Sequence, residues 1–126
     1  MRENKLTIQI KKSSKEILDF CLDPKNTPKW VNSIVREETN EWPVKVGTIY
    51  RNQNTKGEWA EYKVVVITST MFEFVSTSST YHVQYTVKSL TPDTAELEYF
   101  EWMEEGDIPE PFTLASLQKL KSILES

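Results

Sequence analysis

The spacing of hydrophobic and polar residues predicts one strand, two short helices, a run of strands and a final helix. KLTIQI alternates apolar with polar side chains, as a half-buried strand does. SSKEILDFCLD has Ser13 and Glu16 at capping-box spacing, continues with apolar residues at helical spacing, and is stopped by Pro24. A second short helix is predicted from Thr27 as N-cap, with Pro28 in its first turn.

The middle of the chain, from about residue 33 to residue 103, predicts consecutive strands. The strand segments are SIVREET, GTIYRNQ, EWAEYKVVVIT, MFEFVSTSS, TYHVQYTVKSL and AELEYFEWM. Turn residues separate several of them, as in NTKG and at Pro92-Asp93. No helix-length segment lies between them, so the sheet must be antiparallel. Strands this long in a small protein favour a strongly curved sheet.

The last segment, PEPFTLASLQKLKSILES, predicts an amphipathic helix of about 15 residues, counted from Pro111. Its apolar stripe consists of Leu114, Leu117, Leu120 and Leu124. The only large apolar surface that could cover this stripe is the sheet. We therefore expect the helix to pack on one face of the sheet.

This element order resembles the START-like, helix-grip superfamily, which includes polyketide cyclases, small lipid-transfer domains, pollen allergens and activators of chaperone ATPases. DPKNTPKWVNSIV, with Trp30, is similar to the second helix of that superfamily, and VKVGTIYR, with Tyr50 and Arg51, to the entry of its third strand. LASLQKLKSILES is similar to its closing helix.

The resemblance covers nearly the whole chain and implies a single α+β domain over residues 1–126. Its curved antiparallel sheet of six to seven strands would wrap around the C-terminal helix, with two short helices after the first strand. The superfamily holds hydrophobic or amphipathic small molecules in a cavity between sheet and helix. Here the short loops and brief final helix predict a cavity that is small or filled by the protein's own side chains.

Strand parity decides which side chains face that cavity. In residues 81–90 the odd positions are apolar and should face the helix, as should the even positions of 62–66 and Phe72 and Phe74. The last strand is ambiguous. An unbroken strand with Tyr99 inside also brings Glu101 inside, whereas a bulge would turn Phe100 and Trp102 inward and leave Glu101 in solvent.

Composition narrows the classes of partner. The net charge of −4 and pI near 5.1 argue against nucleic acid, because phosphate binding needs a basic surface. No stretch approaches the roughly 18 apolar residues of a membrane span, so stable membrane insertion is not expected. The single cysteine, Cys21, and single histidine, His82, lie on different elements, so we expect no metal site and no cofactor. A chain without a hydrophobic signal core is expected to be cytoplasmic.

The leading hypothesis is a binding module for a small hydrophobic molecule. Core packing alone also explains aromatic residues at alternate strand positions, but buried tyrosine hydroxyls need partners, which points to water or a ligand. The candidate ligand-binding residues are Trp30, Tyr50, Arg51, Tyr62, Phe74, Tyr85, Tyr99, Glu101 and Leu117.

Two alternatives remain open at this stage. One is an enzyme of the polyketide-cyclase or aromatase type, in which Glu101 with Arg51 or a tyrosine would act as acid or base. The lack of an interior histidine argues against it, and no residue is assigned as catalytic. The other is a protein-interaction domain or homodimer that uses Trp59, Trp102 or the acidic segment 104–107.

Overall fold

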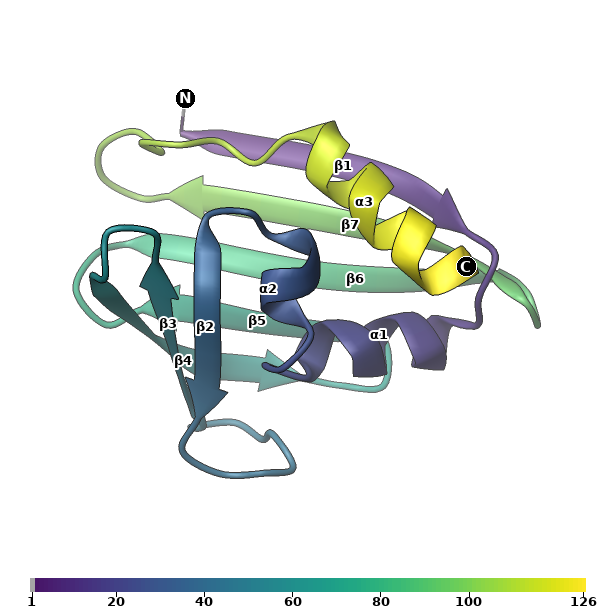
Figure 1. The fold of residues 1–126 in the computed structure, drawn as a ribbon, viewed down its shortest axis with the longest axis horizontal. Coiled ribbons are helices and arrows are strands. Elements are labelled where there is room, and N and C mark those ends of the chain that lie inside the picture. The colour runs from purple at the N-terminus through teal and green to yellow at the C-terminus, as the bar shows by residue number, and fades with distance from the viewer. Residues whose placement is uncertain (1) are drawn as a thin grey trace.

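A computed structural model describes residues 2–126, which form one seven-stranded antiparallel sheet and three helices (Figure 1). The strands are β1 (Glu3–Ile10), β2 (Ile34–Thr39), β3 (Ile49–Asn54), β4 (Trp59–Ile67), β5 (Met71–Ser76), β6 (Tyr81–Thr91) and β7 (Thr94–Met103). The helices are α1 (Ser14–Leu22), α2 (Thr27–Trp30) and α3 (Leu114–Glu125). The predicted α+β architecture and element order are confirmed.

The sheet order is β1-β7-β6-β5-β4-β3-β2, so strands that are neighbours in sequence pair from β2 to β7 and β1 joins the free edge of β7. The sheet is strongly curled, and β2, β3 and β4 cross the direction of β6 and β7 (Figure 1). All three helices lie on the concave side. No helix in residues 2–126 has the length and apolar character needed to cross a bilayer.

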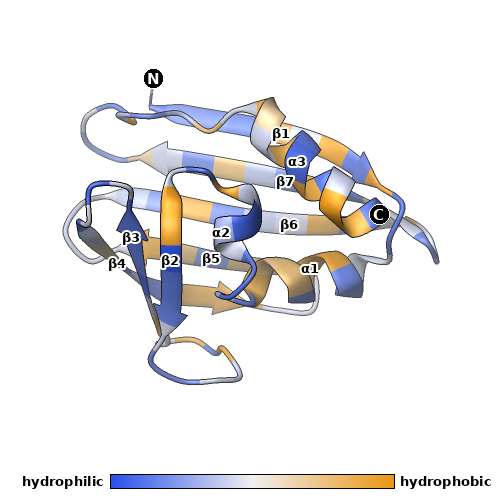
Figure 2. Cartoon of the chain, viewed as in Figure 1, coloured by the Kyte–Doolittle hydropathy of each residue, from blue (hydrophilic) through white to orange (hydrophobic). Residues whose placement is uncertain are grey.

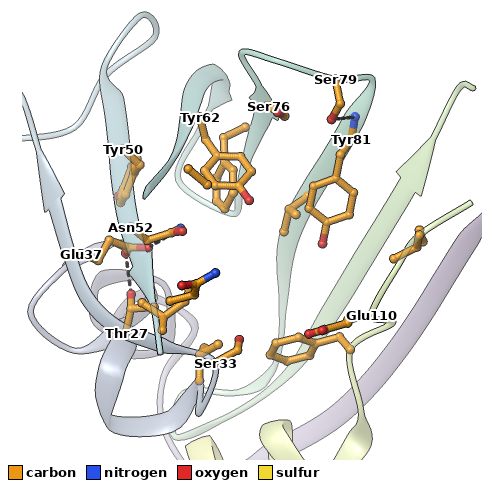
Figure 3. Close-up of a pocket in the computed structure, with 18 of the residues that line it drawn as sticks. Thr27, Ser33, Glu37, Tyr50, Asn52, Tyr62, Ser76, Ser79, Tyr81 and Glu110 are labelled. Carbon is orange, nitrogen blue, oxygen red and sulfur yellow. Dashed lines mark hydrogen bonds between the residues drawn. The ribbon is translucent and has the colours of Figure 1, made fainter. Parts of the chain in front are cut away.

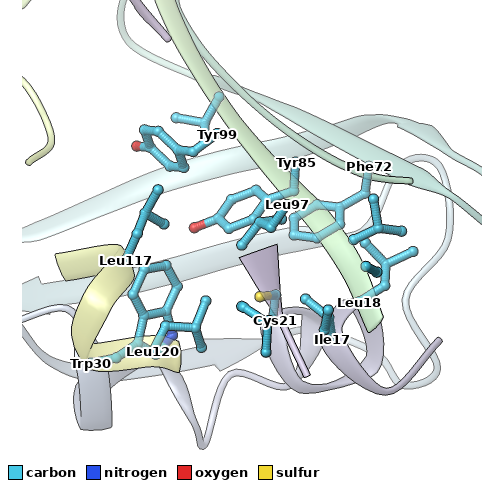
Figure 4. Close-up of a cluster of buried hydrophobic side chains, with 14 of the residues drawn as sticks. Ile17, Leu18, Cys21, Trp30, Phe72, Tyr85, Leu97, Tyr99, Leu117 and Leu120 are labelled. Atoms are coloured by element: carbon cyan, nitrogen blue, oxygen red, sulfur yellow. The ribbon is translucent and has the colours of Figure 1, made fainter. Parts of the chain in front are cut away.

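The hydrophobic core fills the half of the concave face that α1 and α3 cover (Figure 4). Ile17 and Cys21 of α1 pack toward Phe72 and Leu97 of the sheet, while Leu117 of α3 joins them from the other side. At the opposite end of the sheet, β3 and most of β2 consist of hydrophilic residues (Figure 2). The concave face is therefore divided into an apolar half under the helices and a more polar half.

Helix boundaries follow local chemistry. The predicted capping box of α1 is present: the Glu16 backbone N–H donates to Ser13 Oγ at 3.2 Å, and the Ser13 N–H donates to Glu16 Oε1 at 3.3 Å. The N-cap of α2 is Asn26 rather than the predicted Thr27. The Thr27 hydroxyl instead donates to Glu37 Oε1 at 2.6 Å, so this side chain serves a long-range contact.

The prediction that the last helix begins at Pro111 is wrong by three residues. Helix α3 begins at Leu114, because the backbone N–H of Phe112 is engaged by a side chain of β7 and Thr113 is extended. Leu114 consequently remains 43% exposed, whereas Leu117 and Leu120 are fully buried. The predicted stripe docks on the sheet without its first member.

This difference along α3 gives a stability prediction. Leu117→Ala or Leu120→Ala should lower the free energy of unfolding by about 2–5 kcal/mol, because each removes a buried side chain and leaves a cavity. Leu114→Ala is the matched control on the same helix and should cost less than about 1 kcal/mol. Urea unfolding followed by circular dichroism measures all three. Equal losses would mean that α3 does not dock through Leu117 and Leu120.

Candidate functional site

A cavity of about 630 Å³ occupies the more polar half of the concave face (Figure 3). Its walls come from β2–β7, from α1 and α2 and from the loop between β7 and α3. Buried Cys21, Phe72 and Tyr85 form its inner end, and exposed residues such as Glu58 and Ser79 form its mouth. The cavity is thus a deep cleft that opens to solvent at one end.

Both the predicted size and the predicted position of the cavity need correction. It is neither small nor filled, because the curl of β2–β4 carries these strands away from α3. It also does not lie against α3: within the described chain, residues 107–110 and Phe112 contribute to its wall, and 114–125 do not. Helix α3 fills its own part of the concave face with Leu117 and Leu120.

Aromatic rings form a continuous inner wall of the cavity. Tyr50 stacks on Phe74 with centroids 5.7 Å apart, and Tyr62 meets Phe74 edge-on at 5.2 Å. Tyr85 stacks on Phe72 at 4.6 Å. The Tyr50 hydroxyl donates to the Leu22 carbonyl at 2.5 Å, which satisfies it at the C-terminal end of α1. The Tyr62 hydroxyl points into the hollow of the cavity (Figure 3).

The structure separates the candidate site residues into three groups. Those that line the cavity are Tyr50, Tyr62, Phe74, Tyr85 and Tyr99. Trp30 and Leu117 belong instead to the core, where Trp30 meets Tyr85 and Phe112 edge-on. The remaining two, Glu101 and Arg51, do not line the cavity.

Glu101 is fully buried, so the alternative of a solvated Glu101 after a bulge is wrong. Residues 95–102 pair with β1 in an unbroken register, which carries Glu101 inward together with Leu97 and Tyr99. Its Oε1 accepts from the Tyr81 hydroxyl at 2.5 Å. Its Oε2 accepts from Asn4 Nδ2 at 2.8 Å and from the Phe112 backbone N–H at 2.6 Å.

Two of these three donors, Tyr81 and Phe112, line the cavity, whose wall does not include Glu101. A carboxylate with this many internal donors needs no ligand to compensate its burial. Glu101 is therefore a structural brace at the end of the core rather than a lining residue.

Arg51 faces away from the cavity, so its predicted place beside Glu101 is wrong. It lies on the outer face of β3, where its guanidinium is 3.3 Å from Glu38 Oε1 and 4.6 Å from the centre of the Trp59 ring. The neighbouring Tyr50 faces inward, and strand alternation then requires Arg51 to face out. The proposed pairing of Glu101 with Arg51 does not exist.

Sequence reasoning missed Glu37 of β2, a carboxylate in the wall of the cavity that is largely shielded from solvent. An irregularity between Ile34 and Arg36 shifts the pairing with β3, so Ile34 and Glu37, rather than Ile34 and Arg36, face the same side. Glu37 Oε1 accepts from the Thr27 hydroxyl at 2.6 Å, and Asn52 Nδ2 lies 3.4 Å from Oε2 (Figure 3). No local pattern marks such a bulge, which explains the omission.

Burial raises the pKa of Glu37 to about 7, although hydrogen bonds from Thr27 and Asn52 oppose the shift. Burial likewise raises the pKa of Tyr62, and the nearby Glu37 adds to this. The tyrosine hydroxyls therefore stay protonated near neutral pH, while Glu37 exchanges its proton there. The cavity combines hydroxyl donors with one carboxyl group that titrates in the physiological range.

His82 and Cys21 lie in surroundings expected of structural residues. His82 lies on the outer face, 3.3 Å from Glu73 through Nδ1 and stacked on Trp102 at 4.7 Å. Burial raises the pKa of the Cys21 thiol, as expected of an unreactive thiol. Trp59 is 41% exposed, lies beside Arg51 and borders the cavity. Within residues 2–126, no cluster of three metal-ligating side chains occurs.

Comparison with solved structures identifies the fold. A START superfamily protein from Mycobacterium smegmatis superposes with a TM-score of 0.74 at 16% identity, covering 99% of this chain and 98% of the other. The di-domain ARO/CYC protein BexL of the BE-7585A biosynthetic pathway gives 0.75 at 16% identity over 97% of this chain and 46% of BexL. The Aha1 dimer from Colwellia psychrerythraea gives 0.68 at 15% identity, over 99% and 97% of the two chains.

The chain has the START-like helix-grip fold. No protein-family model and no curated protein sequence matches it. At these identities the likeness establishes the helix-grip architecture alone, and the chemistry of the site has to be argued from this chain's own residues.

The arrangement around Glu101 predicts a stability effect without a binding effect. Glu101→Gln should lower the free energy of unfolding by about 1–3 kcal/mol, because a neutral amide cannot accept all three hydrogen bonds with charge assistance. Ligand binding in the cavity should be retained. Glu98→Gln, on the outer face of the same strand, should change stability by less than about 0.5 kcal/mol. Loss of binding with the fold intact would place Glu101 in the site after all.

Glu37 predicts a specific pH dependence of stability. The folded protein keeps the Glu37 proton up to about pH 7, whereas the unfolded chain releases it near pH 4.5. Between these values the folded state binds more protons, so the free energy of unfolding falls as pH rises, by about 1–3 kcal/mol in total. Glu37→Gln should remove this decrease, and Glu38→Gln should not. Identical pH profiles for wild type and Glu37→Gln, from urea unfolding, would contradict the raised pKa.

Proposed function

We propose that this protein binds a small hydrophobic or amphipathic molecule in the cavity lined by Tyr50, Tyr62, Phe74, Tyr85 and Tyr99. The observation that carries the proposal is the open volume of about 630 Å³ inside a chain of 126 residues. Ligand sites of proteins commonly enclose about 300–1,000 Å³ and are lined by aromatic residues with a few polar groups. A volume of this size is difficult to reconcile with close packing for stability alone.

The lining supports an amphipathic ligand rather than a purely apolar one. The rings of Phe72, Phe74 and Tyr85 offer apolar contact area at the inner end. The Tyr62 hydroxyl and the Glu37 carboxyl face the space between these rings and the mouth. A ligand would place its apolar part against the rings, with its polar group near Glu37.

A second candidate function, catalysis by acid–base chemistry, is supported by the pKa of Glu37 near 7. A carboxyl group that exchanges its proton at the working pH can take up and return a proton efficiently. This candidate replaces the earlier pair of Glu101 and Arg51. Binding without turnover remains the simpler function, because Glu37 has no second acid or base of established role beside it. A protein-interaction role through Trp59 or Trp102 stays a prediction.

A bulky residue placed in the cavity should abolish binding. Ser76 ends β5 opposite Tyr62 and lines the cavity, so Ser76→Trp should occupy the space of the ligand. The neutral dye Nile red, which fluoresces more strongly in apolar surroundings, serves as probe. We expect saturable one-to-one binding by the wild type and an affinity at least about tenfold lower for Ser76→Trp.

Val75→Trp is the matched control, because Val75 is the neighbouring residue and pairs with His82 on the outer face. Its affinity for Nile red should stay within about threefold of the wild type. Absence of saturable binding by the wild type, or equal effects of the two tryptophans, would overturn the proposal. Circular dichroism of both variants establishes that each is folded.

A further inference from the structure

The charges around the cavity are of one sign. Its lining includes the acidic residues Glu37, Glu58, Asp107 and Glu110. Over the described residues 2–126, the lining contains no lysine, arginine or histidine. A bound carboxylate or phosphate would therefore enter an acidic mouth and find no cation to neutralise it. The electrostatics favour a neutral or positively charged ligand.

Glu37 is the acidic residue best placed to contact a ligand. It receives one short hydrogen bond, from Thr27 at 2.6 Å, and a long one from Asn52 at 3.4 Å. A carboxylate has about four lone-pair sites, so part of its accepting capacity remains unused. No salt bridge to Glu37 occurs among the residues that the structure describes, and its burial therefore lacks a compensating positive charge.

Aromatic faces lie next to this carboxylate. Tyr50 of β3 and Tyr62 of β4 flank Phe74, with centroid distances of 5.7 Å and 5.2 Å. Glu37 pairs with Asn52 across β2 and β3, two residues from Tyr50 on the same inward face. Rings of this kind attract cations through their negative faces, and a carboxylate beside them supplies a full opposing charge. Together they match the requirements of an ammonium group.

We propose that the ligand of this cavity is a hydrophobic amine, whose protonated nitrogen pairs with Glu37 while its apolar body packs on Tyr50, Tyr62 and Phe74. This inference rests on the ligand-binding function proposed above and names the class of ligand. It also specifies what the cavity rejects: fatty acids and other amphipathic anions of similar size.

Three probes that share a naphthalene ring and differ in their polar group test the inference. They are 2-(1-naphthyl)ethylamine, 2-(1-naphthyl)ethanol and 1-naphthylacetic acid, titrated by calorimetry at about pH 8, where most Glu37 is ionised. We expect the amine to bind at least about tenfold more tightly than the alcohol, because it adds a charge-assisted contact, and the acid to bind most weakly.

Variants of Glu37 and Glu38 test whether the preference for the amine over the alcohol comes from Glu37. Glu37→Gln should bring the affinities of amine and alcohol to within about threefold of each other, while binding of the alcohol is retained. Glu38→Gln is the matched control: Glu38 is the next residue on β2, faces outward and contacts Arg51. This control should keep the full preference for the amine.

The preference should also depend on pH. Between about pH 6 and pH 8 the advantage of the amine over the alcohol should increase, since Glu37 loses its proton over this range. The other titratable groups around Glu37 are Tyr50, Tyr62, Tyr85 and Cys21, whose pKa values burial raises, and the acidic mouth of Glu58, Asp107 and Glu110. Glu37→Gln should remove the increase.

The outcomes distinguish the two proposals. If neither Nile red nor any of the three probes binds, the ligand-binding function itself is wrong. If Nile red binds and the amine does not, the ligand-binding function stands and the amine inference is wrong. If the alcohol or the acid binds as tightly as the amine, the cavity binds ligands but the amine preference is wrong. A preference for the amine that survives Glu37→Gln would also contradict the inference, because its source would then lie elsewhere.

Discussion

The closure of this fold depends on a buried carboxylate. Glu101 of β7 accepts hydrogen bonds from Asn4 of β1, from Tyr81 of β6 and from the backbone of Phe112, and Asn4 also donates to the Phe112 carbonyl. A buried carboxylate without these partners would cost several kcal/mol, so the segments have to assemble around it together. Phe112 is thereby held against Tyr99, with centroids 4.3 Å apart, and α3 can begin only at Leu114.

Glu101 and its hydrogen-bond donors lie between two regions of the concave face, the close-packed core and the cavity. On one side, α1 and α3 cover the sheet with close-packed apolar side chains, which provide the stability. On the other side, α3 does not cover β2–β5, and the curl of these strands encloses the cavity. Glu101 is therefore expected to affect stability without affecting binding, whereas Glu37, which lines the cavity, should affect ligand binding and the pH dependence of stability.

Sequence periodicity predicted the architecture well because burial repeats at every turn of a helix and every second residue of a strand. The inward parity of β6 and the docking of Leu117 and Leu120 followed directly from it. Arg51 was predicted to face the cavity because its charge could pair with Glu101. Its position next to inward-facing Tyr50 instead places it on the outer face. Glu37 was missed because one irregularity in β2 reverses the parity of the residues after it. The cavity's size depends on sheet curl, which arises from many small twists and leaves no local signature.

The central claim is that a ligand occupies the space among Tyr50, Tyr62, Phe74 and Tyr85. Nuclear magnetic resonance of protein labelled in its tyrosine and phenylalanine rings, during titration with 2-(1-naphthyl)ethylamine, tests this most directly. The account predicts saturable shifts of these four rings, with little change at Phe100 on the outer face of β7. Shifts confined to Phe100 and the outer surface, or none at all, would contradict it.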